Sequence, residues 1–159
     1  MFYTVNNNNI YEFADWKFDN DCLYTNTCTA KEYSEDREKY LYNEGVVVIN
    51  PNYHNIVVER ERERVNNLHC TKRVLALVLK ELGVSYANLQ AIIATNEDAQ
   101  LEWDLCVELE RSNPLLDILG AQLGISSTTI DKIFKYANGE ISKEDFDETD
   151  MIKGGIANG

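Results

Sequence analysis

The chain contains 159 residues, of which 44% are hydrophobic, and its 27 acidic and 15 basic side chains give a formal net charge of −12. This is the length of one domain or of two small modules, with enough apolar residues for a buried core. Because phosphate backbones and anionic lipids repel such an acidic surface, the composition counts against binding to nucleic acid or to a membrane surface.

The same composition indicates where the protein resides. The longest apolar runs are too short to span a bilayer. The N-terminal stretch FYTVNNNN lacks the basic start and the apolar run of a signal peptide. We therefore expect a soluble cytoplasmic protein whose four cysteines are reduced.

Residues 1–52 have the pattern of a small β-rich module. A first hairpin is predicted around Asn6–Asn9, because asparagine tolerates the left-handed conformations that a tight turn needs. In its second strand, alternation would place Ile10 and Ala14 on one face, and Tyr11 and Phe13 on the other.

A short helix and a second hairpin complete this module. Thr29–Glu32 has the S/T-x-x-E form of a capping box, which predicts a helix from there to about Tyr40. Asn43–Gly45 is predicted as the turn of the second hairpin. Val46–Ile49 then forms a buried strand, which ends before Pro51 because proline cannot donate to a β-ladder.

A charged connecting helix is predicted over residues 53–70. Glutamate and arginine alternate strictly from Glu59 to Arg64, but Val58, Val65 and Leu68 recur at helical spacing. Both residue types favour helix, and their alternation would surround it with both signs of charge. A basic nucleic-acid-binding patch is therefore not expected in this segment.

Residues 71–139 are predicted to form a compact bundle of about five helices, so the expected fold class is α+β. Residues that commonly cap helices mark the starts at Thr71, Ser85, Thr95 and Ser126 or Ser127. Another helix is predicted to start at Ser112–Pro114, because proline is suited to a first helical turn. The remaining residues, 140–159, are acidic and then glycine-rich, and we expect a mobile tail there.

The stretch from Leu115 to Tyr136 has the spacing of a helix-turn-helix. Gly120 lies where the second helix would cross the first, and Gly124 lies in the turn. DNA binding would need exposed side chains on the second helix that contact bases and phosphates. The charged residues expected there are two lysines, Lys132 and Lys135, and one acidic residue, Asp131. Because this positive charge is small, we expect the helix pair to have a role in packing and not in DNA binding.

No pattern of catalytic or metal-binding residues is present. His54 and His69 are the only histidines, and the cysteines at 22, 28, 70 and 106 lack paired ligand spacing. The acidic residues at 102, 104, 108 and 110 are expected on a solvated helix face and not as a catalytic dyad. We therefore predict no enzymatic activity, no cofactor and no metal.

Aromatic residues are concentrated in the first eighteen positions of the chain. They could form the core of a small sheet, or they could form a surface for a partner, because aromatic side chains concentrate in interface hot spots. The candidate partner-binding residues are Tyr11, Phe13, Trp16, Phe18 and Trp103.

The C-terminal half resembles a segment that recurs in small proteins of the tail or tail-fibre gene region of phages and prophages of Gram-positive bacteria. The opening, with IYEFADWKF and a CLYT strand, is loosely similar to the start of the same proteins. The matching positions are Thr71, Lys72 and Arg73; Lys80, Gly83 and Val84; Asp98, Ala99, Glu102, Trp103 and Asp104; Asn113 to Asp117; Gly120, Ala121 and Leu123 to Ser126; and Ile130, Asp131, Ile133 and Phe134.

One departure concerns the loop before Asn113. The family usually has an aromatic pair and a glycine there, whereas this chain has Glu110, Arg111 and Ser112. The resemblance therefore says little about that loop.

The resemblance implies a structural protein or a tail-fibre assembly factor that binds another phage protein in the cytoplasm of the bacterial host. Two alternatives remain open at this stage. One is a helix-turn-helix regulator that binds DNA, and the other is an acidic phage inhibitor of a host defence protein. The net charge of −12 motivates the second alternative, although its acidic residues are scattered along the chain.

Overall fold

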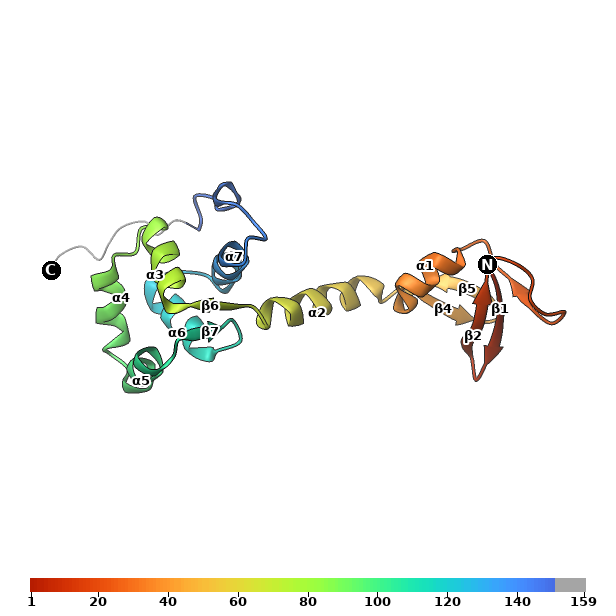
Figure 1. Cartoon of the computed structure of the whole chain (residues 1–159), viewed down its shortest axis with the longest axis horizontal. Helices are drawn as coiled ribbons and strands as arrows, with labels where there is room; N and C mark the ends of the chain where they lie inside the picture. Colours follow the sequence, from red (N-terminus) through yellow and green to blue (C-terminus); the bar gives the residue numbers. More distant parts are fainter. Residues whose placement is uncertain (151–159) are drawn as a thin grey trace. The chain divides into compact units, whose positions relative to one another are not determined.

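The computed structural model describes residues 1–150 and confirms the α+β class predicted from the sequence (Figure 1). The chain forms two compact units, Met1–Arg60 and Glu61–Gly159, and helix α2 (Tyr53–Asn66) crosses the boundary between them. Each unit has its own hydrophobic core. No helix in the described range is long and apolar enough to cross a bilayer.

The first unit opens with a three-stranded antiparallel sheet in the order β2–β1–β3. Its strands are β1 (Phe2–Asn6), β2 (Asn9–Ala14) and β3 (Leu23–Tyr24). The predicted turn between β1 and β2 is confirmed, since Asn7 and Asn8 have φ angles of 48° and 63°.

A bulge in β2 overturns the assignment of faces predicted for that strand from an imperfect alternation. Tyr3 pairs with Phe13 but Val5 pairs with Ile10, so β2 contains one residue more than β1 over this interval. As a result Ile10 and Phe13, which alternation would separate, both pack against the core of the first unit.

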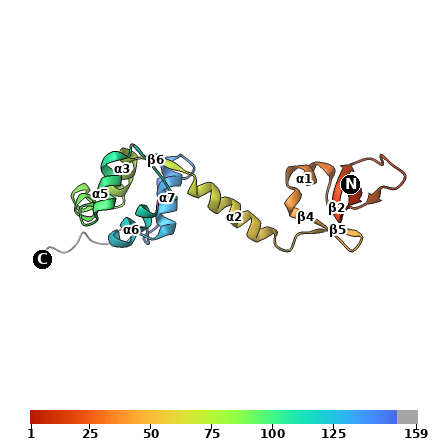
Figure 2. The same ribbon diagram turned by 90° about the horizontal axis from the view of Figure 1, so that it is seen from below.

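Helix α1 (Ala30–Glu35) and the hairpin of β4 (Tyr40–Asn43) and β5 (Val46–Ile49) complete this unit (Figure 2). The strand Val46–Ile49 is present as predicted, but the prediction that it is buried is wrong: Val47 is buried, whereas Val46 and Ile49 are exposed, because β5 pairs only with β4. The predicted capping box is confirmed: the Thr29 amide donates to the Glu32 carboxylate at 2.8 Å, and the Glu32 amide donates to Thr29 Oγ1 at 3.2 Å. The helix ends five residues before Tyr40, and a 3-10 turn, η1 (Arg37–Lys39), follows.

The start of α2 is attached to this unit by polar contacts. Asp36 accepts hydrogen bonds from two Arg60 nitrogens at 2.9 and 3.0 Å and from the Tyr53 hydroxyl at 2.6 Å. Hydrogen bonds from Arg60, and then from Tyr53, lower the pKa of Asp36 to about 2.

The second unit contains the predicted five-helix bundle over residues 71–139, which is confirmed. The helices are α3 (Lys72–Glu81), α4 (Tyr86–Ile93), α5 (Glu97–Leu105), α6 (Pro114–Leu123) and α7 (Ser127–Ala137). The predicted caps at Thr71 and Ser85 each accept a hydrogen bond from a first-turn amide, and of the two candidates Ser126 and Ser127 the cap is Ser126. The helix start predicted at Ser112–Pro114 is confirmed, and Asn113 is its cap. The cap of α5 is Asn96 and not Thr95.

A small antiparallel ladder in this unit was not expected from the sequence. Strand β6 (His69–Thr71) pairs with β7 (Glu108–Glu110). The sequence had predicted helix at residues 69–70, as the end of the connecting helix, and at residues 108–110. The ladder places Cys70 directly opposite Leu109, and both side chains are buried. Burial of these two residues explains why α2 and α5 end before the positions at which we expected helix to continue.

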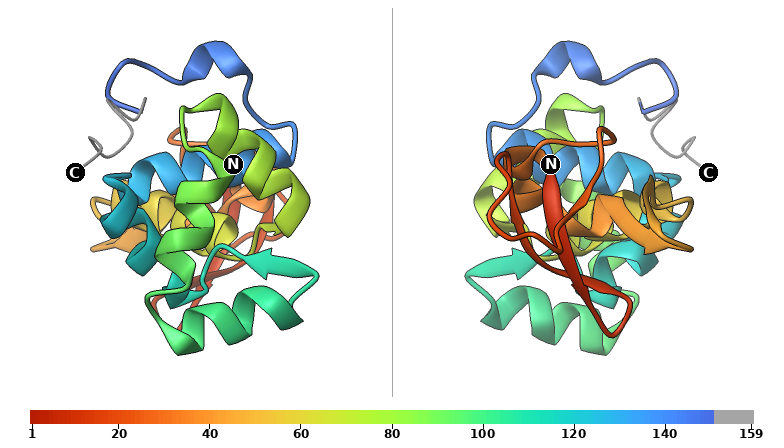
Figure 3. Two further views of the ribbon diagram at one scale, coloured as in Figure 1. Left: turned by 90° about the vertical axis from the view of Figure 1, so that its left-hand side faces the viewer. Right: turned by 90° about the vertical axis from the view of Figure 1, so that its right-hand side faces the viewer.

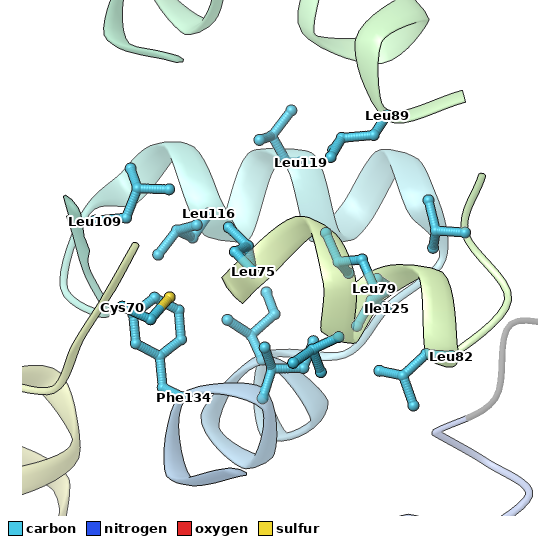
Figure 4. Close-up of a cluster of buried hydrophobic side chains, with 14 of the residues drawn as sticks. Cys70, Leu75, Leu79, Leu82, Leu89, Leu109, Leu116, Leu119, Ile125 and Phe134 are labelled. Atoms are coloured by element: carbon cyan, nitrogen blue, oxygen red, sulfur yellow. The ribbon is translucent and has the colours of Figure 1, made fainter. Parts of the chain in front are cut away.

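The core of the second unit is formed mainly by leucine, isoleucine and aromatic side chains, and all five helices contribute to it. Figure 4 shows members of this core from α3, α4, α6 and α7. Phe134 and Ile133 of α7 are almost completely buried, and so are Leu89 of α4 and Leu109 of β7. This packing joins the helical pair α6–α7 to the rest of the unit.

The segment after α7 differs from the mobile tail expected over residues 140–159. It contains a 3-10 turn, η2 (Lys143–Asp145), and Phe146 packs edge-on against Tyr136 with ring centroids 5.7 Å apart. Asp150 is buried and accepts hydrogen bonds from Thr129 Oγ1 at 2.7 Å and from Lys132 Nζ at 2.6 Å. Residues 140–150 therefore belong to the second unit, and the rest of the predicted tail lies outside the described residues.

Candidate functional site

The predicted partner-binding residues differ in their exposure. Tyr11 and Trp16 are 66% and 70% exposed. Phe13 packs against the core, with its ring centroid 4.7 Å from that of Tyr33, and Phe18 is half-buried. Trp103 is buried in the second unit, so it is not part of the N-terminal aromatic group.

The outer face of the three-stranded sheet carries a ring contact that the sequence did not suggest. Phe2 lies directly opposite Ala14 on one side and Tyr24 on the other, so the three side chains share one face. The rings of Phe2 and Tyr24 have centroids 5.0 Å apart, and Tyr24 is 65% exposed. We call Phe2, Ala14 and Tyr24 the aromatic face.

The opposite face of this sheet holds the core. Tyr3 and Phe13 pair directly, and Tyr3 is almost completely buried. The aromatic face differs in exposure along its width, since Tyr24 is exposed, Phe2 is half-buried and Ala14 is buried. The signal that could have located Tyr24 was the short CLYT strand, because a strand paired with β1 brings Tyr24 beside Phe2.

The helix-turn-helix geometry predicted for residues 115–136 is confirmed. Gly124 has a φ angle of 72° and ends α6. A Cβ on Gly120 would lie 2.5 Å from Ile130 Cδ1 and 3.1 Å from the Ile125 carbonyl oxygen, so glycine permits the close crossing of the two helices.

The basic side chains of α7 already have acidic partners within the second unit. Lys132 contacts Asp150 at 2.6 Å, and Lys135 contacts Glu61 at 2.8 Å. Asp131, which immediately precedes Lys132 in the sequence, accepts a hydrogen bond from Arg111 Nε at 2.6 Å. The helix in the position of a DNA-reading helix thus presents little unpaired positive charge.

Arg111 links β7 to this helix pair and was not singled out from the sequence. Its side chain is 6% exposed, and it also donates to Ser127 Oγ at 2.6 Å and pairs with Asp117 at 3.2 Å. This residue lies in the loop that departs from the resemblance. The buried guanidinium of Arg111 bridges α6 and α7, because it pairs with Asp117 of α6 and Asp131 of α7, whose carboxylates are exposed to solvent.

Burial disfavours the thiolate form of three of the four cysteines. The four cysteines, all within the described residues, are unpaired, and burial raises the pKa of the Cys70 thiol to about 12. Burial also raises the pKa values of Cys28 and Cys106. Within residues 1–150 no group of three or more histidine, cysteine or acidic side chains could hold a metal ion.

The second unit has an open cleft of about 490 Å³ that is lined by α3, α4 and α5. Helix α4 runs between the other two helices (Figure 3, left). Helix α3 contributes most of its wall, Tyr86 and Gln90 come from α4, and Trp103 and Asp104 come from α5. The basic residues of the wall are Lys72, Arg73 and Lys80. We call this the basic cleft.

Comparison of the chain with protein-family models, with curated proteins and with solved structures gave no match.

Proposed function

We propose that this protein acts without catalysis, by binding another protein, as an accessory of the tail region of a bacteriophage or prophage. The phage context rests on the sequence resemblance of the C-terminal half. The binding role rests on one observation, the aromatic face, where Tyr24 is largely exposed beside Phe2.

A ring pair on a sheet with one exposed ring, Tyr24, and one half-buried ring, Phe2, is a suitable surface for a protein partner. Aromatic side chains bring a large apolar area with few rotatable bonds, so little conformational entropy is lost on binding. Tyr11 and Trp16, which follow on β2 and just after it, add further exposed aromatic area. Hot-spot residues of this kind typically contribute about 2 kcal/mol or more to an interface.

The charge distribution favours this role over the two alternatives. Lys132 and Lys135 are neutralised by carboxylates, which reduces the attraction of α7 for DNA. Asp147 and Asp150 pair with Lys132, so these acidic residues are not a free array that mimics a phosphate backbone.

Co-expression with the tail-fibre protein encoded in the same genome region tests the proposal. We expect the affinity-tagged full chain to retain the fibre protein from a nuclease-treated lysate, because the contact involves protein and not bridging DNA. We also expect less soluble fibre protein when the chain is omitted. Failure to co-purify together with unchanged fibre solubility would contradict the proposal.

A further inference from the structure

The basic cleft carries positive charge that the protein itself does not neutralise. Five other basic residues of the second unit pair with carboxylates within 4 Å: Arg64, Arg111, Lys132, Lys135 and Lys143. The side chains of Arg73 and Lys80 make no ion pair with any residue between 1 and 150. In a chain of net charge −12, these two cations form an isolated basic site.

The two cations stand on one face of α3 with apolar residues between them. Arg73 and Lys80 are seven residues apart, which is two helical turns or about 10.5 Å. Ala76 and Leu77 lie between them on the same face and also line the cleft, and Leu77 is 46% exposed. The face therefore has the order basic, apolar, basic.

The neighbouring helix α5 presents the complementary order. Glu97 and Asp104 are also seven residues apart, with Leu101 between them at 59% exposure. These residues lie opposite the face of α5 that buries Ala99 and Trp103. The carboxylates of Glu97 and Asp104 make no ion pair with any described residue, so this face has the order acidic, apolar, acidic.

Apolar exposure is concentrated around the same two helices. The described part of the second unit has six exposed large hydrophobic residues, and five of them come from α3, α4, α5 or the residues between α5 and β7. These five are Leu77, Tyr86, Leu101, Leu105 and Val107. Lys72 links α3 to α5, since its Nζ donates to the Trp103 carbonyl oxygen at 2.5 Å and lies 5.9 Å from the Trp103 ring centroid.

We propose that the occupant of the basic cleft is α5 of a second copy of this chain, in a two-fold symmetric dimer. Antiparallel docking places Arg73 against Asp104 of the other copy and Lys80 against its Glu97. The apolar residues of both helices then meet between the ion pairs. Because one unit carries both complementary faces, a two-fold axis satisfies both at once and closes the assembly as a dimer.

This inference involves the second unit only and stands apart from the proposed binding of a phage protein through the aromatic face. The ion pairs set the register, and burial of the leucines supplies the affinity. A nucleic-acid ligand is disfavoured because the cleft offers only three basic residues, Lys72, Arg73 and Lys80, in a strongly acidic protein.

A charge-swap experiment on the full chain tests the dimer by sedimentation equilibrium. We expect wild-type protein at about 100 μM to have twice the monomer mass of 18.2 kDa. Variant A carries Arg73→Glu and Lys80→Glu, and variant B carries Glu97→Lys and Asp104→Lys. Each should be a monomer alone, because like charges then face each other, and an equimolar mixture of A and B should form a heterodimer.

The control separates local pairing from net charge. Lys17→Glu with Lys31→Glu changes the net charge of the chain by the same amount as variant A, but in the first unit, and should remain dimeric. Circular dichroism establishes that each variant is folded before it is compared. A monomeric wild type, dimers of variant A or B alone, or a mixture that stays monomeric would each overturn the proposal, whether or not the fibre protein is bound.

Discussion

Gly120 and Ile130 meet where α6 and α7 cross, and this contact shows how one residue determines the path of a helix pair. A side chain at position 120 would collide with the end of Ile130 and press on the Ile125 carbonyl oxygen. Arg111, which follows β7, stabilises the same helix pair by donating hydrogen bonds to Asp131 and Ser127 of α7. Glycine therefore permits the crossing, and the buried arginine fixes it.

We predict that Gly120→Ala destabilises the second unit by about 1–3 kcal/mol, because the added methyl group overpacks the crossing. Gain of helix propensity at this position offsets only part of that cost. Urea denaturation measures the effect, and Gln122→Ala on the exposed face of α6 is the matched control. A variant as stable as wild type would mean that α6 and α7 are less closely packed than described.

At the scale of the elements, polar contacts attach α2 to the first unit and the segment after α7 to the second. Asp36 lies at the end of α1 and receives hydrogen bonds from the first and second turns of α2. Phe146 and Asp150 attach the C-terminal segment to α7. Both attachments join residues that are distant along the chain.

Asp36 should have a pKa close to 2 in the folded protein, and Arg60→Ala should raise it towards the ordinary value of about 3.9. Since the folded-state pKa is the lower one, the stabilisation is complete above about pH 4 and is lost as the pH falls towards 2. NMR titration of the side-chain carboxyl carbon measures this shift. Lys31→Ala, which removes an exposed lysine from α1, should leave the pKa of Asp36 unchanged.

Phe146→Ala should destabilise the second unit by about 2–3 kcal/mol, because its ring is buried against Tyr136. In a Trp16→Phe background the remaining tryptophan, Trp103, reports the unfolding of this unit by fluorescence. Glu148→Ala, at an exposed position in the same segment, serves as the control. Equal stability of the two variants would support the mobile tail that we expected from the sequence.

Elements with local signals were predictable from the sequence. Caps such as Thr29 and Ser126, and the asparagine turn at Asn7, act within a few residues and were found. The β6–β7 ladder was missed because Cys70 and Leu109 are 39 positions apart, and their pairing depends on the tertiary packing of the bundle. Phe146 was missed because a single aromatic residue in an acidic segment gives no periodic signal.

The candidate site was predictable only in part, for the same reason. The cluster of N-terminal aromatic residues was visible, but a pattern of residue types does not tell a buried ring such as Tyr3 from an exposed one such as Trp16. The β2 bulge moved Phe13 to the core side, and Tyr24 became a site residue only through its pairing with β1. The basic cleft requires three helices and had no signal in any single segment.

For the whole molecule, two units with separate cores carry two different candidate surfaces. The first unit presents the aromatic face, and the second presents the basic cleft. We assign partner binding to the first and self-association to the second. The two surfaces share no residue, so each can be removed by substitution without changing the other.

Isothermal titration calorimetry of the purified tail-fibre protein with the full chain tests the central claim most directly. The account predicts that Tyr24→Ser with Trp16→Ser weakens the affinity at least about tenfold, because the exposed rings supply the contact. Ile118→Ser, which alters an exposed apolar residue of the second unit, should bind as wild type does. Equal affinities for wild type and the aromatic variant would contradict the account.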